Sequence, residues 1–176
     1  MLLSIGRRKQ ALDLPDLLLD CHERIRHFSA LAVRLAREDA SDDERRGVAA
    51  SIARYFEQAL PLHVRDEEDS IYRRLHGRDA AVDAALACMR GEHAEHEAWR
   101  SELVARTREI SIDASTYASH VERLRVLSPV FKDALLAHLE PEERIIIPAL
   151  TRLLSVEERR AILREMRERR SARPGS

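Results

Sequence analysis

The sequence predicts an all-α protein, an up-down-up-down four-helix bundle with a short fifth helix at its C-terminus. Three observations predict this fold. Apolar residues recur at three- and four-residue spacing along most of the chain, capping and proline signals divide it into long segments, and strand signals are almost absent. The 176 residues include only five Gly and six Pro, which excludes collagen-like and low-complexity chains, and the length fits one domain.

The first two helices are expected from their start and stop signals. Pro15 opens a helix that continues to about Arg37. A capping box at residues 41–44 begins the second helix, which runs to about His76. Gly77 suits the stop that follows.

Two long helices and a short one follow. The third helix is expected from about Asp79 to Arg108, and residues 110–115, rich in Ser and Asp, are expected to form a loop. The fourth helical stretch runs to about Leu154, with an interruption at Ser128-Pro129 where the helix restarts. A second capping box, at residues 155–158, begins the fifth helix.

An internal repeat relates residues 56–75 to residues 131–150. Both copies contain a His-x-x-x-Glu motif within an apolar stripe, and the shared positions lie on one helical face. Eight of the twenty aligned pairs are identical: Phe56/Phe131, Ala59/Ala134, Leu60/Leu135, His63/His138, Glu67/Glu142, Glu68/Glu143, Ile71/Ile146 and Leu75/Leu150. One such motif is weak evidence, but two in matching contexts indicate a shared site.

The two motifs indicate a metal site. A buried carboxylate is costly unless positive charge compensates it, and no Lys or Arg lies on either stripe near the motifs. His and Glu four residues apart point the same way, so each pair can chelate one cation. Inward-facing His residues are also expected on the first and third helices. The predicted metal ligands are His22, His63, Glu67, His93, His138 and Glu142.

Six ligands are too many for one tetrahedral zinc ion. They suit two metal ions bridged by the two carboxylates and a solvent oxygen, with room for an exogenous ligand on each ion. Imidazole-rich sites of this kind favour iron, and manganese and zinc are the alternatives. A structural His–Glu pair in each helix is the competing interpretation.

This ordered set of residues resembles the hemerythrin-like HHE cation-binding domain family over about residues 14–154. The matching segments are Cys21-His22-Glu23-Arg24-Ile25, His63-x-x-x-Glu67, Met89-Arg90-Gly91-Glu92-His93, and His138-x-x-x-Glu142-Glu143 with Pro148 behind it. The resemblance implies a hemerythrin-like metal-binding domain over residues 1–154. It is followed by a basic amphipathic helix over 155–170 and a frayed tail over 171–176.

The resemblance also implies a function. Family members carry a non-haem di-iron centre, oxo- or hydroxo-bridged when oxidised. They bind oxygen, sense oxygen, nitric oxide or iron, or repair iron–sulfur centres under nitrosative stress. The leading expectation is therefore a non-enzymatic di-iron protein that binds a diatomic ligand, and the alternative is a di-iron enzyme of stress defence or iron–sulfur repair. A scaffold with one metal or none is the third hypothesis.

The third helix departs from the oxygen-carrying members. Those place two His four residues apart on this helix, whereas His93 and His96 are three apart. The family pattern selects His93, which follows a Glu and lies four residues after Met89. His96 stays open as a seventh ligand or a supporting group, and Glu97 is expected to accept a hydrogen bond from a ligand. Reversible oxygen carriage is therefore in doubt.

Several other side chains are expected to have no part in the metal site itself. His27, His76 and His120 are expected to face solvent or loops, and Cys21 and Cys88 to be core thiols. Pro141 must kink or loosen the helix beside the site, because its ring clashes with the carbonyl of residue 137.

Charge and hydropathy limit the partners. The net charge of −1 excludes a broad nucleic-acid footprint. Short apolar runs and the lack of a secretory signal predict no membrane span and a cytoplasmic protein. The fifth helix is expected to cap the bundle with a solvated face; a surface for a homodimer or a protein partner is the alternative. Its basic residues are Arg159, Arg160, Arg164, Arg167, Arg169 and Arg170.

Overall fold

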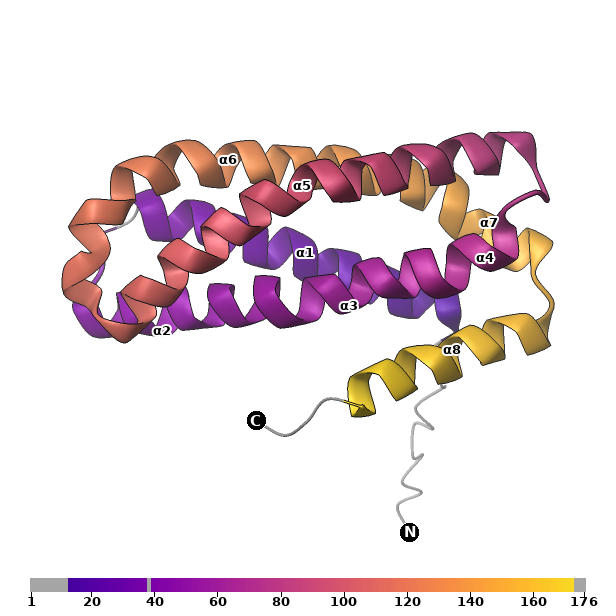
Figure 1. Ribbon diagram of the computed structural model, residues 1–176, viewed down its shortest axis with the longest axis horizontal. Helices are drawn as coiled ribbons and strands as arrows, with labels where there is room; N and C mark the ends of the chain where they lie inside the picture. The colour runs from indigo at the N-terminus through magenta and orange to yellow at the C-terminus, as the bar shows by residue number, and fades with distance from the viewer. Residues whose placement is uncertain (1–12, 38, 173–176) are drawn as a thin grey trace, which may run out of the picture.

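The chain folds as four long antiparallel helical rods with a fifth helix packed beneath one end (Figure 1). The computed structural model describes residues 13–37 and 39–172, and these contain helices and turns but no strand. The predicted fold class is confirmed. The elements are α1 (Leu14–Arg37), α2 (Asp42–Arg54), η1 (Tyr55–Ala59), α3 (Leu60–Arg65), η2 (Asp66–Ile71), α4 (Tyr72–Leu75), α5 (Ala80–Ile112), η3 (Ala114–Thr116), α6 (Tyr117–Pro141), η4 (Glu142–Ile146), α7 (Ile147–Leu153) and α8 (Val156–Ser171).

These elements join into rods. The second rod runs without a break from α2 to α4, and the fourth from α6 to α7. Helix α1 packs against α2 and α6, and α5 packs against the same two helices from the other side. The predicted frayed tail lies mostly outside the described residues, because 173–176 are not described and α8 ends at Ser171.

The predicted helix ends are largely confirmed. Ser41 and Glu44 form a complete capping box at the start of α2, and Ser155 and Glu158 form another at the start of α8. Gly77 has a φ of 82°, in the left-handed region that favours glycine, and ends the turn after α4.

Two predicted boundaries are wrong. Pro129 lies inside α6, which continues through it without interruption, because the buried neighbours Leu127 and Phe131 hold this turn against the bundle. The expected loop over 110–115 is shorter, since α5 continues to Ile112. Ile110 is fully buried there, so packing outweighs the weak helix propensity of the nearby Ser and Asp.

Three π-helical turns interrupt the α-helical hydrogen bonding of the second and fourth rods. In η2 the N–H of Tyr72 donates to the carbonyl of Glu67, and in η4 the N–H of Ile147 donates to the carbonyl of Glu142. Pro141 is the last residue of α6 and η4 begins at the next residue, but η2 forms at the aligned place without a proline, so the predicted loosening by Pro141 stays a prediction. Single π turns of this kind are frequent at functional sites.

The turn η1 shows how such a break is compensated. Pro61 has no N–H to donate to the carbonyl of Phe56, which lies five residues back in the π register. The guanidinium of Arg100 donates to that carbonyl instead, at 2.9 Å. A side chain of α5 thus completes the backbone hydrogen bonding of the second rod.

The core is divided into two apolar clusters. One joins α8 to the end of the bundle and includes Leu18, Ile71, Leu86 and Leu150. The other lies toward the opposite end of the rods and consists of residues such as Ile25, Phe56, Leu103, Phe131 and Leu135. On the first three rods the predicted metal ligands come between the two clusters in sequence; on the fourth, Glu142 does so and His138 directly precedes the last cluster member, Leu139. The site is therefore a polar layer across the middle of an apolar bundle.

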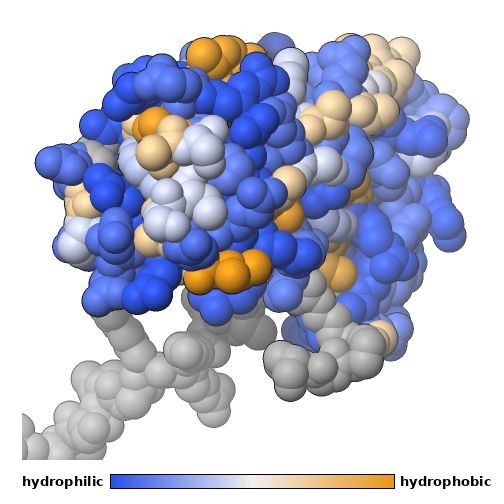
Figure 2. Space-filling model, turned by 60° about the vertical axis from the view of Figure 1, so that its left-hand side comes forward, coloured by the Kyte–Doolittle hydropathy of each residue, from blue (hydrophilic) through white to orange (hydrophobic). Residues whose placement is uncertain are grey.

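The outer surface is mainly polar. The face shown in Figure 2 is largely hydrophilic, with scattered apolar side chains. Within the described ranges, no helix combines the length and the apolar character that crossing a membrane requires.

Candidate metal centre

The structure brings together all six residues predicted as ligands, from all four rods. They form two overlapping groups, and within each group one ligand atom per residue lies within 4.8 Å of the others. Both glutamates belong to both groups. The first group is His22, His63, Glu67 and Glu142, and the second is Glu67, His93, His138 and Glu142.

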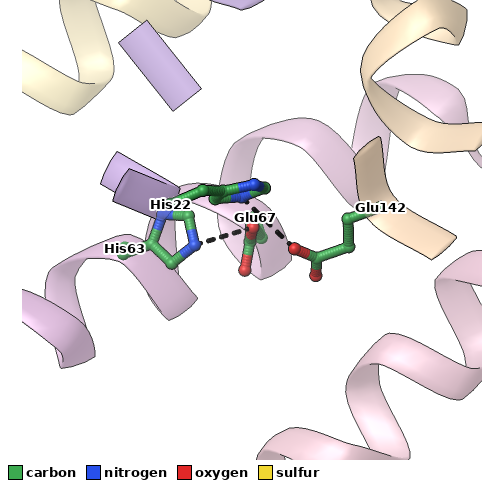
Figure 3. Close-up of side chains that lie close together, drawn as sticks. All are labelled: His22, His63, Glu67 and Glu142. Carbon is green, nitrogen blue, oxygen red and sulfur yellow. Dashed lines mark ion pairs between the residues drawn. The ribbon is translucent and has the colours of Figure 1, made fainter. Parts of the chain in front are cut away.

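Each glutamate faces two imidazoles on different rods. Glu67 Oε1 lies 3.1 Å from His63 Nε2, and Glu67 Oε2 lies 3.3 Å from His93 Nε2. Glu142 Oε1 lies 3.0 Å from His138 Nε2, and Glu142 Oε2 lies 3.4 Å from His22 Nε2. Figure 3 shows His22, His63, Glu67 and Glu142 converging on one point between the rods. This is the arrangement expected of two bridging carboxylates.

The donor atoms are buried and unsatisfied. The six side chains are at most 7% exposed. Six of their inward atoms have no hydrogen-bond partner among the described residues: Nε2 of His22, His63 and His93, Oε2 of Glu67, and Oε1 and Oε2 of Glu142. Buried polar atoms are rarely left without partners, so the convergence of these atoms fits a cation-binding site. Nitrogen and carboxylate donors suit a transition metal.

The electrostatics of the site also call for positive charge. Burial alone would lower the pKa of His138, but Glu142 and neighbouring carboxylates outweigh burial and raise that pKa to about 9. The pKa of His63 is likewise raised well above its ordinary value, because Glu67 outweighs the effect of burial. The metal-free site therefore holds protons where cations would lie.

Three further carboxylates fix the outer nitrogens of the histidines. His22 Nδ1 lies 2.9 Å from Glu143, His93 Nδ1 lies 2.9 Å from Glu68, and His138 Nδ1 lies 2.7 Å from Glu92. Each contact leaves Nε2 of the same ring directed inward. Two of these acceptors were detectable in the sequence, because Glu68 and Glu143 are aligned in the repeat. Their role was nevertheless missed.

His63 has a different neighbour on its outer side. Cys21, whose side chain is buried, lies in the corresponding place and contacts Arg24 at 3.3 Å. Burial raises the pKa of the Cys21 thiol, but His63 and Arg24 outweigh it and the net shift is downward. Cys21 therefore lies beside His63 as Glu92 lies beside His138, and each of the two residues directly precedes a predicted ligand in the sequence.

Glu97 does not support a ligand, contrary to the prediction. Its carboxylate bonds Arg100 and Ser101 and is 58% exposed, because it lies on the outer face of α5. His96 lies outside both ligand groups, with its ring 5.5 Å from that of His138. Burial and His138 lower the pKa of His96 to about 4, so this ring is neutral at pH 7.

Two other assignments need correction. His120 is buried rather than solvent-facing, and it lies 2.9 Å from Glu109 because α6 packs against α5. Cys88 is exposed rather than part of the core. His76, as predicted, is exposed.

A mainly apolar cavity of about 240 Å³ reaches the site from the side. It touches three of the six predicted ligands, His63, His93 and His138, as well as His96. Its apolar lining includes Ile25, Leu60, Pro61, Val64, Phe131 and Leu135. The cavity gives a small uncharged molecule space beside the ligand atoms.

Comparison with known proteins agrees with the geometry. A family model described as the Hemerythrin HHE cation binding domain matches residues 13–150. Neither the search of curated proteins nor the search of solved structures found a match. The matched residues include all six predicted ligands and end before α8.

Proposed function

Because this chain belongs to the hemerythrin HHE cation-binding domain family, we propose that it binds a non-haem di-iron centre through His22, His63, Glu67, His93, His138 and Glu142. The observation that carries the proposal is the pair of buried carboxylates, each facing two imidazoles from different rods. Iron held there would supply a redox-active centre able to bind a diatomic ligand. Manganese and zinc are the competing metals.

The chain's own residues prepare the site for such a ligand. Each group offers four protein donors, two imidazoles and two shared carboxylates, which is fewer than the six that iron commonly takes. The mainly apolar cavity beside His63, His93 and His138 leaves an approach to the donors for a small molecule. We therefore propose that the protein binds or senses oxygen or nitric oxide.

The second candidate is a di-iron enzyme that turns over peroxide or nitric oxide with an external reductant. The cavity of about 240 Å³, larger than the roughly 150 Å³ that accommodates benzene in an engineered protein cavity, leaves room for such a substrate beside the donors. Repeated turnover in the presence of a reductant would support catalysis. A reaction that stops after one equivalent would support binding or sensing.

The first experiment is metal analysis with a visible spectrum of the iron-reconstituted protein. We expect about two irons per chain and a ligand-to-iron charge-transfer band that bleaches on reduction. Glu67→Gln and Glu142→Gln should each reduce the iron content and the band. The matched control is Glu97→Gln, which alters a His-x-x-x-Glu motif whose carboxylate faces outward. Less than one iron per wild-type chain after reconstitution would overturn the proposal.

A further inference from the structure

The C-terminal helix α8, which lies beyond the family match, reaches the residue next to Glu67. Asp66 is fully buried, and both of its carboxylate oxygens are bonded by arginines of α8. Arg169 Nε donates to Asp66 Oδ1 at 2.8 Å, and Arg170 Nη2 donates to Asp66 Oδ2 at 2.6 Å. These two arginines were expected on a solvated face. They instead neutralise a buried carboxylate adjacent to a predicted bridging ligand.

A second set of contacts binds the same π-helical turn, η2, at Ser70, four residues after Asp66. Arg169 Nη2 donates to the hydroxyl of Ser70 at 2.6 Å, and that hydroxyl donates to Glu165 of α8 at 2.6 Å. Arg74 completes the group with a bond of 2.5 Å to Glu165. The contacts lie on both sides of Glu67 and Glu68. Glu67 faces the imidazoles of His63 and His93, and Glu68 fixes the outer nitrogen of His93.

The repeat shows that only η2, of the two aligned π turns, has the side chains that α8 binds. Asp66 aligns with Pro141, and Ser70 aligns with Ile145. The second π turn, η4, therefore has neither the carboxylate nor the hydroxyl that α8 binds in η2. A proline, which has no N–H to donate, precedes η4, whereas η2 is held from outside by ion pairs.

We propose that Asp66 is a positioning residue and that α8, through Arg169 and Arg170, holds the turn that presents Glu67 and Glu68 to the metal centre. This inference rests on the proposed function. Apolar packing supports the docked position, since Ile162 and Met166 of α8 lie in the same core cluster as Ile71. Loss of the ion pairs then loosens the first bridging carboxylate while the second, in η4, keeps its support.

The test compares variants of the full chain. Arg169→Ala/Arg170→Ala removes both partners of Asp66, and Arg170→Ala alone is the milder variant, because this side chain is 37% exposed. Arg169→Lys/Arg170→Lys keeps both positive charges and should behave much like the wild type in both readouts. The matched control is Arg78→Ala, which removes an ion pair with Glu158 at the other end of α8.

Two readouts separate positioning from folding. In the metal-free protein, hydrogen exchange of the amides of residues 67–72 should quicken about tenfold in the Arg169 and Arg170 variants. In the iron-loaded protein, transfer of iron(II) to a chelator should quicken about 10- to 100-fold, the factor by which metal affinity usually falls when a group that supports a ligand is lost. Urea unfolding of each variant shows whether the whole bundle has been destabilised instead.

The outcomes distinguish this inference from the proposed function. Faster local exchange and faster iron loss, with Arg78→Ala like the wild type, support the inference. Wild-type iron binding with unchanged variants would overturn the inference and leave the di-iron proposal intact. Equal effects of Arg78→Ala and the Arg169 and Arg170 variants would also overturn it. A wild-type chain that binds no iron would overturn both.

Discussion

The metal-free protein is expected to lose stability as the pH rises above 7. The pKa of His138 is about 9 in the folded chain, against 6.5 for an ordinary histidine. Its proton is therefore bound more tightly in the folded state, so the stabilisation is fully present below pH 6.5 and is lost as the pH rises through 9. Linkage gives a loss of about 2–3 kcal/mol between pH 7 and pH 10 from this group. His63, whose pKa is also raised, adds a loss of the same sign.

Urea unfolding of the chelator-treated protein at pH 7, 8, 9 and 10, followed by far-UV circular dichroism, measures this loss. The matched variant is His138→Gln, which has no proton to lose and should fall less steeply than the wild type. Iron loading should also flatten the profile, because the metal replaces the protons. Equal slopes for wild type and His138→Gln would refute the reasoning, since the loss would then come from groups outside the site.

Three further changes test other parts of the molecule. Glu92→Gln or Glu143→Gln should lower metal affinity about 10- to 100-fold in a chelator competition, by freeing the ring of His138 or His22; an unchanged affinity would deny these carboxylates a role. Phe131→Ala should lower the free energy of unfolding in urea by about 3–5 kcal/mol, because this ring is 1% exposed, whereas Val130→Ala, at a side chain 48% exposed, should change it little. Similar losses of free energy for the two variants would contradict the assigned core. Leu135→Trp should narrow the cavity and slow azide binding to the iron-loaded protein at unchanged metal content, and an unaltered rate would mean that azide enters elsewhere.

Much of the fold was predictable because the sequence marks it locally. The capping boxes at residues 41–44 and 155–158 and the glycine at position 77 act within a few residues, so they survive in the structure. The restart predicted at Pro129 failed for the opposite reason. Packing of the neighbouring turn against other rods compensates for one lost hydrogen bond, and no local pattern reports that packing.

The candidate site divides in the same way. The six inward donors were predictable, because helical periodicity fixes which side chains share a face. The repeat marks two partners of their outer nitrogens, Glu68 and Glu143, but it does not show which rings they meet. Glu92 has no counterpart in the repeat and binds a ring on a different rod from its own. The position at which α8 packs was not predictable from the sequence either. A row of arginines shows a basic helix, but it does not show which of them meets a buried aspartate 104 positions away.

The polar layer between the two apolar clusters has a consequence for how metal enters and leaves. The layer joins the clusters through groups that are satisfied only when a cation or protons lie among them. In the metal-free protein we expect this layer to be the least stable cross-section of the bundle. The end that contains α8 is then expected to open as a unit while the opposite cluster stays folded. Metal exchange would follow such a partial opening, at a rate set by one end of the molecule and without complete unfolding.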